Sequence, residues 1–133
     1  MGNRKEDKLN EKTAKKPRVL VVDDNPEIIW VVETQLKERR DIEVVTADNG
    51  ENALKLIEAL NFDLIISDLN MPNGDGMWLL SKLKDKAHAP VMIHSGERVP
   101  MRKLREMGAI GFLPKPATGE RFQAIIDFLL GAP

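Results

Sequence analysis

The sequence predicts an α/β fold, in which a parallel sheet carries helices on both faces. Continuous apolar runs, such as residues 19–22 and 64–66, suit strands that are buried on both faces. Amphipathic segments alternate with these runs, which is the pattern of repeated βα units with right-handed crossovers. Each of four runs also ends in a polar residue. Because parallel strands point the same way, these ends share the edge at which open α/β sheets bind ligands.

The first two strands are each followed by a helix start signal. We expect the first strand at about 18–23 and a helix from Pro26, since Asn25 can cap a free N–H and Pro lacks one. The stripe predicted to be buried on that helix comprises Ile28, Ile29, Val32 and Leu36. We expect the second strand at 42–45 and a helix opened by Asn49-Gly50. Its residues predicted to face the sheet are Ala53, Leu54, Ile57 and Leu60.

The remaining strands repeat this pattern with a shorter fourth helix. The third strand is expected at about 63–68, followed by a Pro- and Gly-rich loop and a helix marked by Met77, Leu80 and Leu83. Pro90 starts the fourth strand. The fourth helix, at about 99–107, is expected to be brief because Pro100 lies inside it, and Gly108 suits the position past its end. A strand at about 110–114 and a helix at about 119–130 complete five βα units.

The composition is that of one ordinary globular domain. The chain has 133 residues, a formal net charge of -1 and 42% hydrophobic residues. It has no cysteine and only two histidines, which excludes disulfides and thiolate chemistry and argues against a zinc site. No apolar stretch is long enough to span a bilayer, and no secretory signal is visible, so we expect a cytoplasmic protein.

Charge is concentrated at the N-terminus. Residues 1–17 carry six basic and three acidic side chains, a net charge of +3, which leaves -4 for the rest of the chain. We expect 1–17 to be a disordered basic tail and 18–131 to be the folded domain. Contact of the tail with nucleic acid or an acidic partner is the alternative.

The polar residues at the strand ends form a chemically coherent set. Asp23, Asp24 and Asp68 would bring three carboxylates together, which raises their pKa values unless a cation is present. Magnesium takes oxygen ligands of this kind together with phosphate oxygens. Ser95 and Lys115 at the same edge would bind phosphoryl oxygens, and a carboxylate can itself attack phosphorus.

These motifs resemble the receiver domain of two-component response regulators over about residues 18–130. The motifs are Asp23-Asp24, Asp68 with Met71-Pro72 and Asp75-Gly76, Ser95-Gly96, and Lys115-Pro116. Each motif is weak alone, but their order and their places at strand ends form a strong signal. The resemblance implies a flavodoxin-like (βα)5 fold with strand order 2-1-3-4-5.

The resemblance also implies a role for each matching residue. Asp68 matches the phosphoacceptor, and Asp24 a direct ligand of Mg²⁺ or Mn²⁺. Asp23 would act mainly through a metal-bound water and Asn70 through its backbone carbonyl. Further matches are the switch residues Ser95 and Phe112, the phosphoryl-binding Lys115, the cis peptide Lys115-Pro116, and the hydrolysis-tuning positions Asn70 and Glu97.

The implied function is a phosphoacceptor signalling domain rather than an enzyme. A sensor histidine kinase or histidine phosphotransferase would phosphorylate Asp68, and the face made by the fourth helix, fifth strand and fifth helix would change. Self-phosphorylation from small phosphodonors and autodephosphorylation are also expected. Nothing resembles a helix-turn-helix, so we do not expect direct nucleic-acid binding. We also expect no membrane binding, since no apolar stretch is long enough to span a bilayer.

Two other functions remain open. A pseudo-receiver that is never phosphorylated would use the same fold as an interaction scaffold, with Asp68, Asp24 and Lys115 as a structural ion pair network. A Mg²⁺-dependent hydrolase that passes through an aspartyl-phosphate would need a second acid two residues after its nucleophile. Asn70 and Asn25 stand at those two positions instead.

Several single residues also have structural interpretations. Ser95 and Phe112 could be ordinary core residues, and His94 is expected to be a partly buried, hydrogen-bonded histidine. We expect Trp30 and Trp78 to pack on helix faces. Gly74 indicates a loose loop after Asp68.

Overall fold

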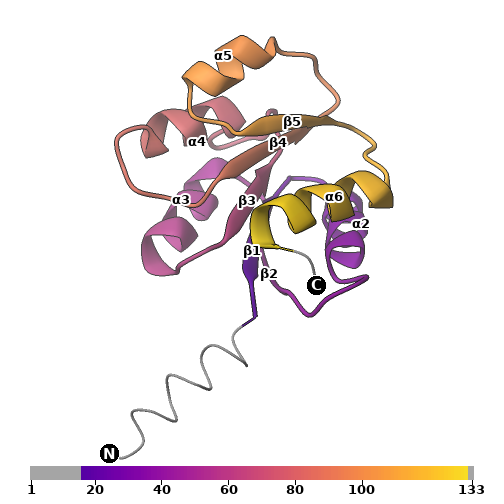
Figure 1. Ribbon diagram of the computed structural model, residues 1–133. Helices are drawn as coiled ribbons and strands as arrows, with labels where there is room; N and C mark the ends of the chain where they lie inside the picture. The colour runs from indigo at the N-terminus through magenta and orange to yellow at the C-terminus, as the bar shows by residue number, and fades with distance from the viewer. Residues whose placement is uncertain (1–15, 132–133) are drawn as a thin grey trace, which may run out of the picture.

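Five parallel strands form one sheet in the order β2-β1-β3-β4-β5 in the computed structural model, which describes residues 16–131. The strands are β1 (Arg18–Val22), β2 (Glu43–Ala47), β3 (Leu64–Ser67), β4 (Val91–Ser95) and β5 (Gly111–Pro114). The helices are α2 (Pro26–Leu36), α3 (Gly50–Ala59), α4 (Gly76–Leu83), α5 (Met101–Glu106) and α6 (Gly119–Leu130). The predicted fold class and strand order are confirmed (Figure 1).

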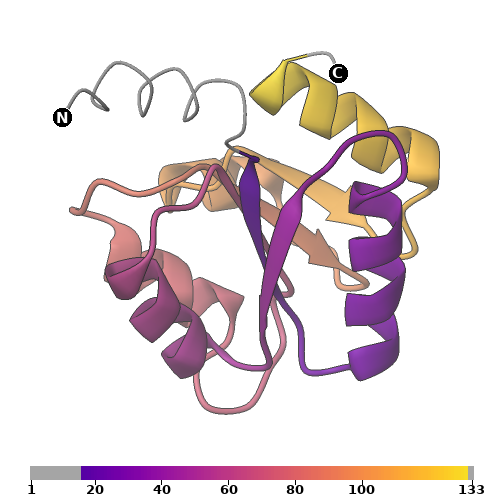
Figure 2. The same cartoon turned by 90° about the horizontal axis from the view of Figure 1, so that it is seen from below.

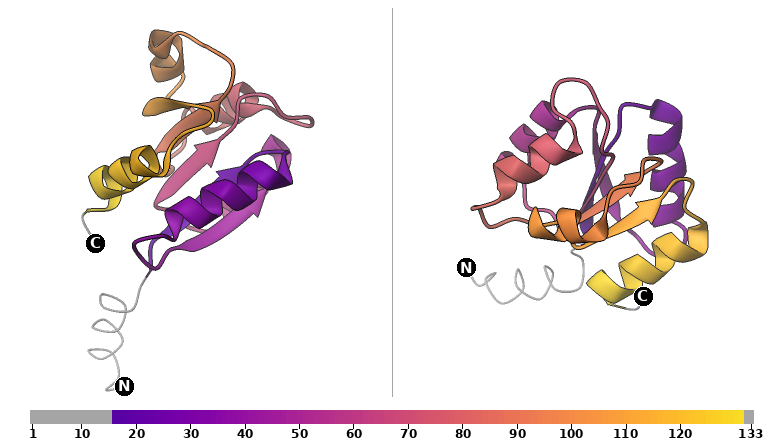
Figure 3. Two further views of the ribbon diagram at one scale, coloured as in Figure 1. Left: turned by 90° about the vertical axis from the view of Figure 1, so that its right-hand side faces the viewer. Right: turned by 90° about the horizontal axis from the view of Figure 1, so that it is seen from above.

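The helices form two layers around the sheet. α2 and α6 cover one face, and α3, α4 and α5 cover the other (Figures 2 and 3). Alternate residues of one strand enter opposite cores: Val19 and Val21 pack in the α2 and α6 layer, Leu20 and Val22 in the other. All four side chains are at most 1% exposed. This two-sided burial explains why the strands are continuous apolar runs rather than alternating ones.

Side chains cap four of the five helices at their N-termini. The Asn25 side chain accepts a hydrogen bond from the Glu27 N–H, and the Asn49 side chain accepts one from Asn52. Asp75 and Thr118 cap α4 and α6 in the same way. α5 has only six residues, which confirms the predicted short helix, and it follows Pro100 without a side-chain cap. Gly108 follows it with φ of 102°, a left-handed conformation that suits glycine.

The second strand lies later in the chain than predicted. β2 begins at Glu43 and continues to Ala47, because parallel pairing with β1 runs from Arg18↔Glu43 to Val22↔Ala47. The apolar pattern ended at Val45 and gave no signal for the exposed Thr46. Pro17, which we assigned to the tail, extends the ladder by accepting a hydrogen bond from the Glu43 N–H. The predicted disorder of residues 1–15 lies outside the described residues.

Two side chains are at the surface, although Trp30 was predicted to pack on a helix face and Leu60 to face the sheet. Trp30 on α2 is 68% exposed and Leu60, which follows α3, is 36% exposed, so neither is a core residue. Trp78 is half-buried on α4, as expected. No helix in the described range is long and apolar enough to cross a membrane.

Candidate functional site

The sheet itself positions two of the acidic residues. Asp23 directly follows β1, and its backbone N–H donates to the Ala47 carbonyl of β2 at 3.1 Å. Asp68 directly follows β3, and its N–H donates to the Val22 carbonyl of β1 at 2.9 Å. Both residues therefore continue the hydrogen-bond ladder past the strand ends, and their backbones are fixed relative to each other.

Three carboxylates meet at this edge. One oxygen from each of Asp23, Asp24 and Asp68 lies within 4.8 Å of the others. Asp23 and Asp68 are 2% and 7% exposed, while Asp24 is open to solvent. The Asn25 N–H holds Asp23 Oδ1 at 3.0 Å, and the Leu69 N–H holds Asp68 Oδ1 at 2.7 Å. The predicted convergence of the three acids is confirmed.

Lys115 is the cation of the cluster. It follows β5, and its Nζ lies 2.7 Å from Asp23 Oδ2 and 3.2 Å from Asp68 Oδ2. Burial alone would lower the pKa of Lys115, but its hydrogen bonds and charge interactions with the two carboxylates outweigh burial and raise this pKa. The ammonium group therefore stays charged and links the ends of β1, β3 and β5.

The charged form of Asp23 is disfavoured despite its ion pair with Lys115. Burial raises its pKa, and the Asp68 charge adds to the increase, while hydrogen bonds from Lys115 and the Asn25 N–H oppose it. One ammonium group thus compensates a cluster of three carboxylates incompletely. An added divalent cation would relieve this imbalance.

The donor set fits magnesium. The three carboxylate oxygens are hard anionic ligands that lie close together. Asp24 is exposed, so water molecules can reach an ion bound there. Magnesium prefers such oxygen ligands and keeps several of its waters. Manganese accepts the same donors.

Ser95 and Lys115 are neighbours across two strands. Ser95 ends β4 with 1% of its surface exposed, and its carbonyl accepts a hydrogen bond from the Lys115 N–H at 2.9 Å. Its Oγ accepts a hydrogen bond from the Glu97 N–H at 3.1 Å. The Lys115-Pro116 peptide bond is cis.

The other predicted site residues lie around this centre. Asn70 and Glu97 are exposed on the loops that follow Asp68 and Ser95. Phe112 is half-buried on β5 and packs against the core below α4 and α5. In the sheet it pairs with Ile93 of β4, two residues before Ser95.

The loop after Asp68 is firmly anchored, which corrects the expectation of a loose loop. The Gly50 and Glu51 N–H groups at the start of α3 donate to the carbonyls of Gly74 and Asn73, at 2.7 and 3.2 Å. Asn73 and Gly74 have φ of 52° and 97°, which turns both carbonyls toward α3. A Cβ at Gly74 would also press on Trp78.

The base of the same loop is closed by Gly76. Its N–H donates to the Leu69 carbonyl at 2.8 Å. A Cβ at Gly76 would overlap the Asp68 carbonyl oxygen. Glycine is therefore required for the close approach of α4 to the backbone of Asp68. The Asp75-Gly76 pair of the family motif is the sequence signal for this close approach.

The prediction that His94 is partly buried and hydrogen-bonded is wrong. This histidine is 4% exposed on β4, and its Nε2 has no hydrogen-bond partner, so it is buried without being satisfied. Its ring meets the ring of Phe122 on α6 edge-on, with centroids 5.3 Å apart. Burial lowers the pKa of His94 to about 4, and the nearby Lys115 charge adds to the decrease.

Comparison with known proteins gives a consistent family. Residues 19–127 match the response regulator receiver domain. The chain is 30% identical over 124 residues to a probable chemotaxis protein CheY of Rhizobium etli, covering 90% of this chain and 96% of that protein. It is 38% identical over 105 residues to a protein-glutamate methylesterase/protein-glutamine glutaminase of Bacillus subtilis, covering 75% of this chain but only 29% of that enzyme.

A solved structure agrees in fold. The Francisella response regulator 1452 receiver domain superposes with a TM-score of 0.77 at 32% identity, covering 86% of this chain and 96% of that one.

Proposed function

This chain belongs to the response regulator receiver domains, and on that premise we propose that Asp68 accepts a phosphoryl group from the phosphohistidine of a sensor histidine kinase or histidine phosphotransferase. The observation that carries the proposal is the convergence of three carboxylates and one lysine at the carboxyl edge of the sheet. A segment of one sensor kinase supports this class of partner: the Vibrio cholerae CAI-1 autoinducer sensor kinase/phosphatase CqsS is 32% identical over 113 residues, covering 80% of this chain and 16% of that protein.

The geometry indicates how Asp68 would react. The Leu69 N–H holds Oδ1, while Lys115 holds Oδ2, so the carboxylate is oriented before a phosphodonor arrives. A carboxylate oxygen would bond to phosphorus as the phosphorus–nitrogen bond breaks, and the electron pair would leave on the imidazole, which takes a proton. Bound Mg²⁺, held by Asp23, Asp24, Asp68 and the Asn70 carbonyl, would neutralise charge on the transferring phosphoryl group.

Lys115 and Ser95 would bind the product. The Lys115 ammonium already lies 3.2 Å from Asp68, so it needs little movement to reach a phosphoryl oxygen. The Ser95 hydroxyl, now bonded to the Glu97 N–H, would donate to another oxygen. Movement of Ser95 toward the phosphoryl group would break its hydrogen bond with the Glu97 N–H and free space for Phe112. The phosphorylated and unphosphorylated states would then differ at α5, β5 and α6.

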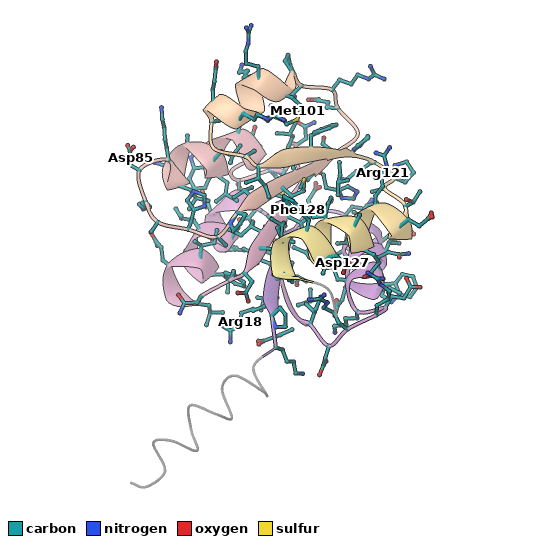
Figure 4. The ribbon with its side chains drawn as sticks, in the orientation of Figure 1. Arg18, Asp85, Met101, Arg121, Asp127 and Phe128 are labelled. Carbon is teal, nitrogen blue, oxygen red and sulfur yellow. The ribbon has the colours of Figure 1, made fainter. Side chains whose placement is uncertain are left out.

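Intact-mass spectrometry with acetyl phosphate or phosphoramidate and Mg²⁺ tests the proposal. We expect one phosphoryl adduct on the wild type and none on Asp68→Asn. Asp85→Asn is the matched control, because Asp85 is an exposed carboxylate away from the site (Figure 4), and it should retain the adduct. A folded wild type that neither gains the adduct nor binds beryllofluoride would support the interaction scaffold instead.

A further inference from the structure

Two Asn-Gly pairs meet where α3 contacts the loop after Asp68. Asn49-Gly50 begins α3, and Asn73-Gly74 lies in the loop. In such a pair the backbone nitrogen of the glycine can attack the side-chain amide carbon of the asparagine, because glycine has no side chain to block the approach. The attack requires that the nitrogen and the amide are both free to meet. The two pairs differ in this respect, so they can be compared within one molecule.

The first pair is held at both reacting groups. The Gly50 N–H donates to the Gly74 carbonyl at 2.7 Å. The Asn49 side chain accepts a hydrogen bond from the Asn52 N–H at 2.8 Å, and its amide nitrogen donates to Asp48 Oδ1 at 2.9 Å. Attack within this pair would first have to break these hydrogen bonds and open the start of α3.

The nearby pair Asp75-Gly76, whose carboxyl can react with the glycine nitrogen in the same way, is held too. The Gly76 N–H donates to the Leu69 carbonyl at 2.8 Å, and the Asp75 side chain accepts a hydrogen bond from the Trp78 N–H at 2.9 Å. Gly76 is also buried. Neither reacting group of this pair is therefore free.

The second Asn-Gly pair is free at both reacting groups. Among residues 16–131, the Asn73 side chain and the Gly74 N–H form no hydrogen bond. Asn73 is exposed, and its φ of 52° places it in a turn rather than in a helix or strand. Its carbonyl accepts a hydrogen bond from the Glu51 N–H at 3.2 Å. That bond draws electron density from the peptide between Asn73 and Gly74, so the Gly74 N–H is easier to deprotonate.

We infer that Asn73 is a site of spontaneous deamidation, whereas the fold protects Asn49. The Gly74 nitrogen loses its proton to hydroxide and bonds to the Asn73 amide carbon, and the amide nitrogen takes a proton from water and leaves as ammonia. Water then opens the cyclic imide at either of its two carbonyl carbons. The product is aspartate or isoaspartate in place of Asn73, and the net reaction consumes water and releases ammonia.

Isoaspartate at this position would disturb the anchor of the loop. In isoaspartate the chain continues through the former side chain, which adds a methylene group to the backbone between Asn73 and Gly74. The Gly74 carbonyl would then shift away from the Gly50 N–H, so the contact between the loop and α3 should loosen. Any effect on phosphorylation of Asp68 rests on the proposed function, but the conversion of Asn73 does not.

Peptide mapping of the aged protein tests the inference. The whole chain is incubated in mildly alkaline buffer made with heavy-oxygen water, in the folded state and in concentrated urea, and is then digested for mass spectrometry. Heavy oxygen marks the residues that were converted before digestion. In the folded protein we expect Asn73 to convert roughly tenfold or more faster than Asn49, because Asn49 must first lose its hydrogen bonds. In urea the two rates should become similar.

Three outcomes would overturn the inference. They are equal rates at the two asparagines of the folded protein, faster conversion at Asn49, and an Asn73 that is stable in the folded protein but converts in urea. Asn73→Gln is the matched variant, because glutamine would have to form a larger ring that closes more slowly. This variant should lose the conversion at its own position and leave the rate at Asn49 unchanged.

The peptide map also separates this inference from the proposed function, because it does not involve Asp68. A wild type that converts at Asn73 but takes no phosphoryl group in the mass assay would defeat only the proposed function. A wild type that is phosphorylated but shows no faster conversion at Asn73 would defeat only the inference.

Discussion

The buried His94 gives this domain a stability that depends on pH in a defined window. We consider the variant His94→Leu, which removes the titrating ring and the unpaired Nε2 while keeping apolar volume against Phe122. In the folded protein the pKa of His94 is lowered to about 4, compared with 6.5 for an unperturbed histidine. Between these two values the unfolded chain binds the proton and the folded chain does not.

The sign of the effect follows from this difference in proton binding. Stability is fully present above pH 6.5 and falls as the pH decreases toward 4, because protonation favours the unfolded chain. For these pKa values the wild type should lose about 2.5 kcal/mol between pH 8 and pH 4.5 through His94 alone. The leucine variant lacks this term, although both proteins share the titration of their carboxylates.

Urea denaturation of both proteins at a series of pH values measures the difference. The free energy of unfolding of the variant minus that of the wild type should rise by about 2.5 kcal/mol as the pH falls through this window. Equal m-values in the two proteins would show that the same surface is exposed on unfolding. A difference that stays flat from pH 8 to pH 4.5 would refute the assignment of His94 as a buried neutral ring.

Four further predictions concern the site and its supports. Gly76→Ala should destabilise the fold by about 1–3 kcal/mol and slow phosphorylation, because the added Cβ would overlap the Asp68 carbonyl oxygen. In the control Gly96→Ala the added Cβ meets no atom within 4 Å, so urea denaturation and the mass assay should show unchanged stability and unchanged phosphorylation. Lys115→Met removes the ammonium group that competes with Mg²⁺ for the carboxylates of Asp23 and Asp68. Added Mg²⁺ should therefore raise the Tm of this variant more than the Tm of the wild type or of the control Lys55→Met. Equal Tm shifts in the three proteins would contradict this prediction. Asp127→Asn weakens the ion pairs with Arg39 and Arg40 that connect α6 to the segment after α2. The free energy of unfolding should fall by about 1 kcal/mol, and by less at high salt. A loss of stability that does not depend on salt would indicate a packing effect instead. Asn70 and Glu97 are exposed on the loops after Asp68 and Ser95, and we predict that they tune hydrolysis, so alanine at either position should change the phosphoryl lifetime in a decay assay. Unchanged lifetimes would reject that role.

The sequence was sufficient for features that depend on local pattern. Apolar runs buried on both faces identified the strands, and Asn25 and Asn49 identified helix starts, because capping involves neighbours only a few residues away. The convergence of Asp23, Asp68 and Lys115 followed from the rule that parallel strands share one carboxyl edge.

Features that depend on distant partners could not be predicted in this way. β2 reaches Ala47 only because β1 supplies a pairing partner. The role of Gly74 depends on the start of α3, and the unsatisfied state of His94 depends on the apolar surface that α6 places against it. Aromatic character predicted that Trp30 packs on a helix face, but its position on α2 leaves it 68% exposed.

The loop after Asp68 and the helix α5 are held in place to different degrees. The hydrogen bond from the Gly50 N–H to the Gly74 carbonyl joins α3 to the loop, and the one from the Asp68 N–H to the Val22 carbonyl joins the end of β3 to β1. α5 has no side-chain cap and only Leu104 fully buried among its residues. We therefore expect a displacement that begins at Asp68 to meet more resistance from the anchored loop and α3 than from α5.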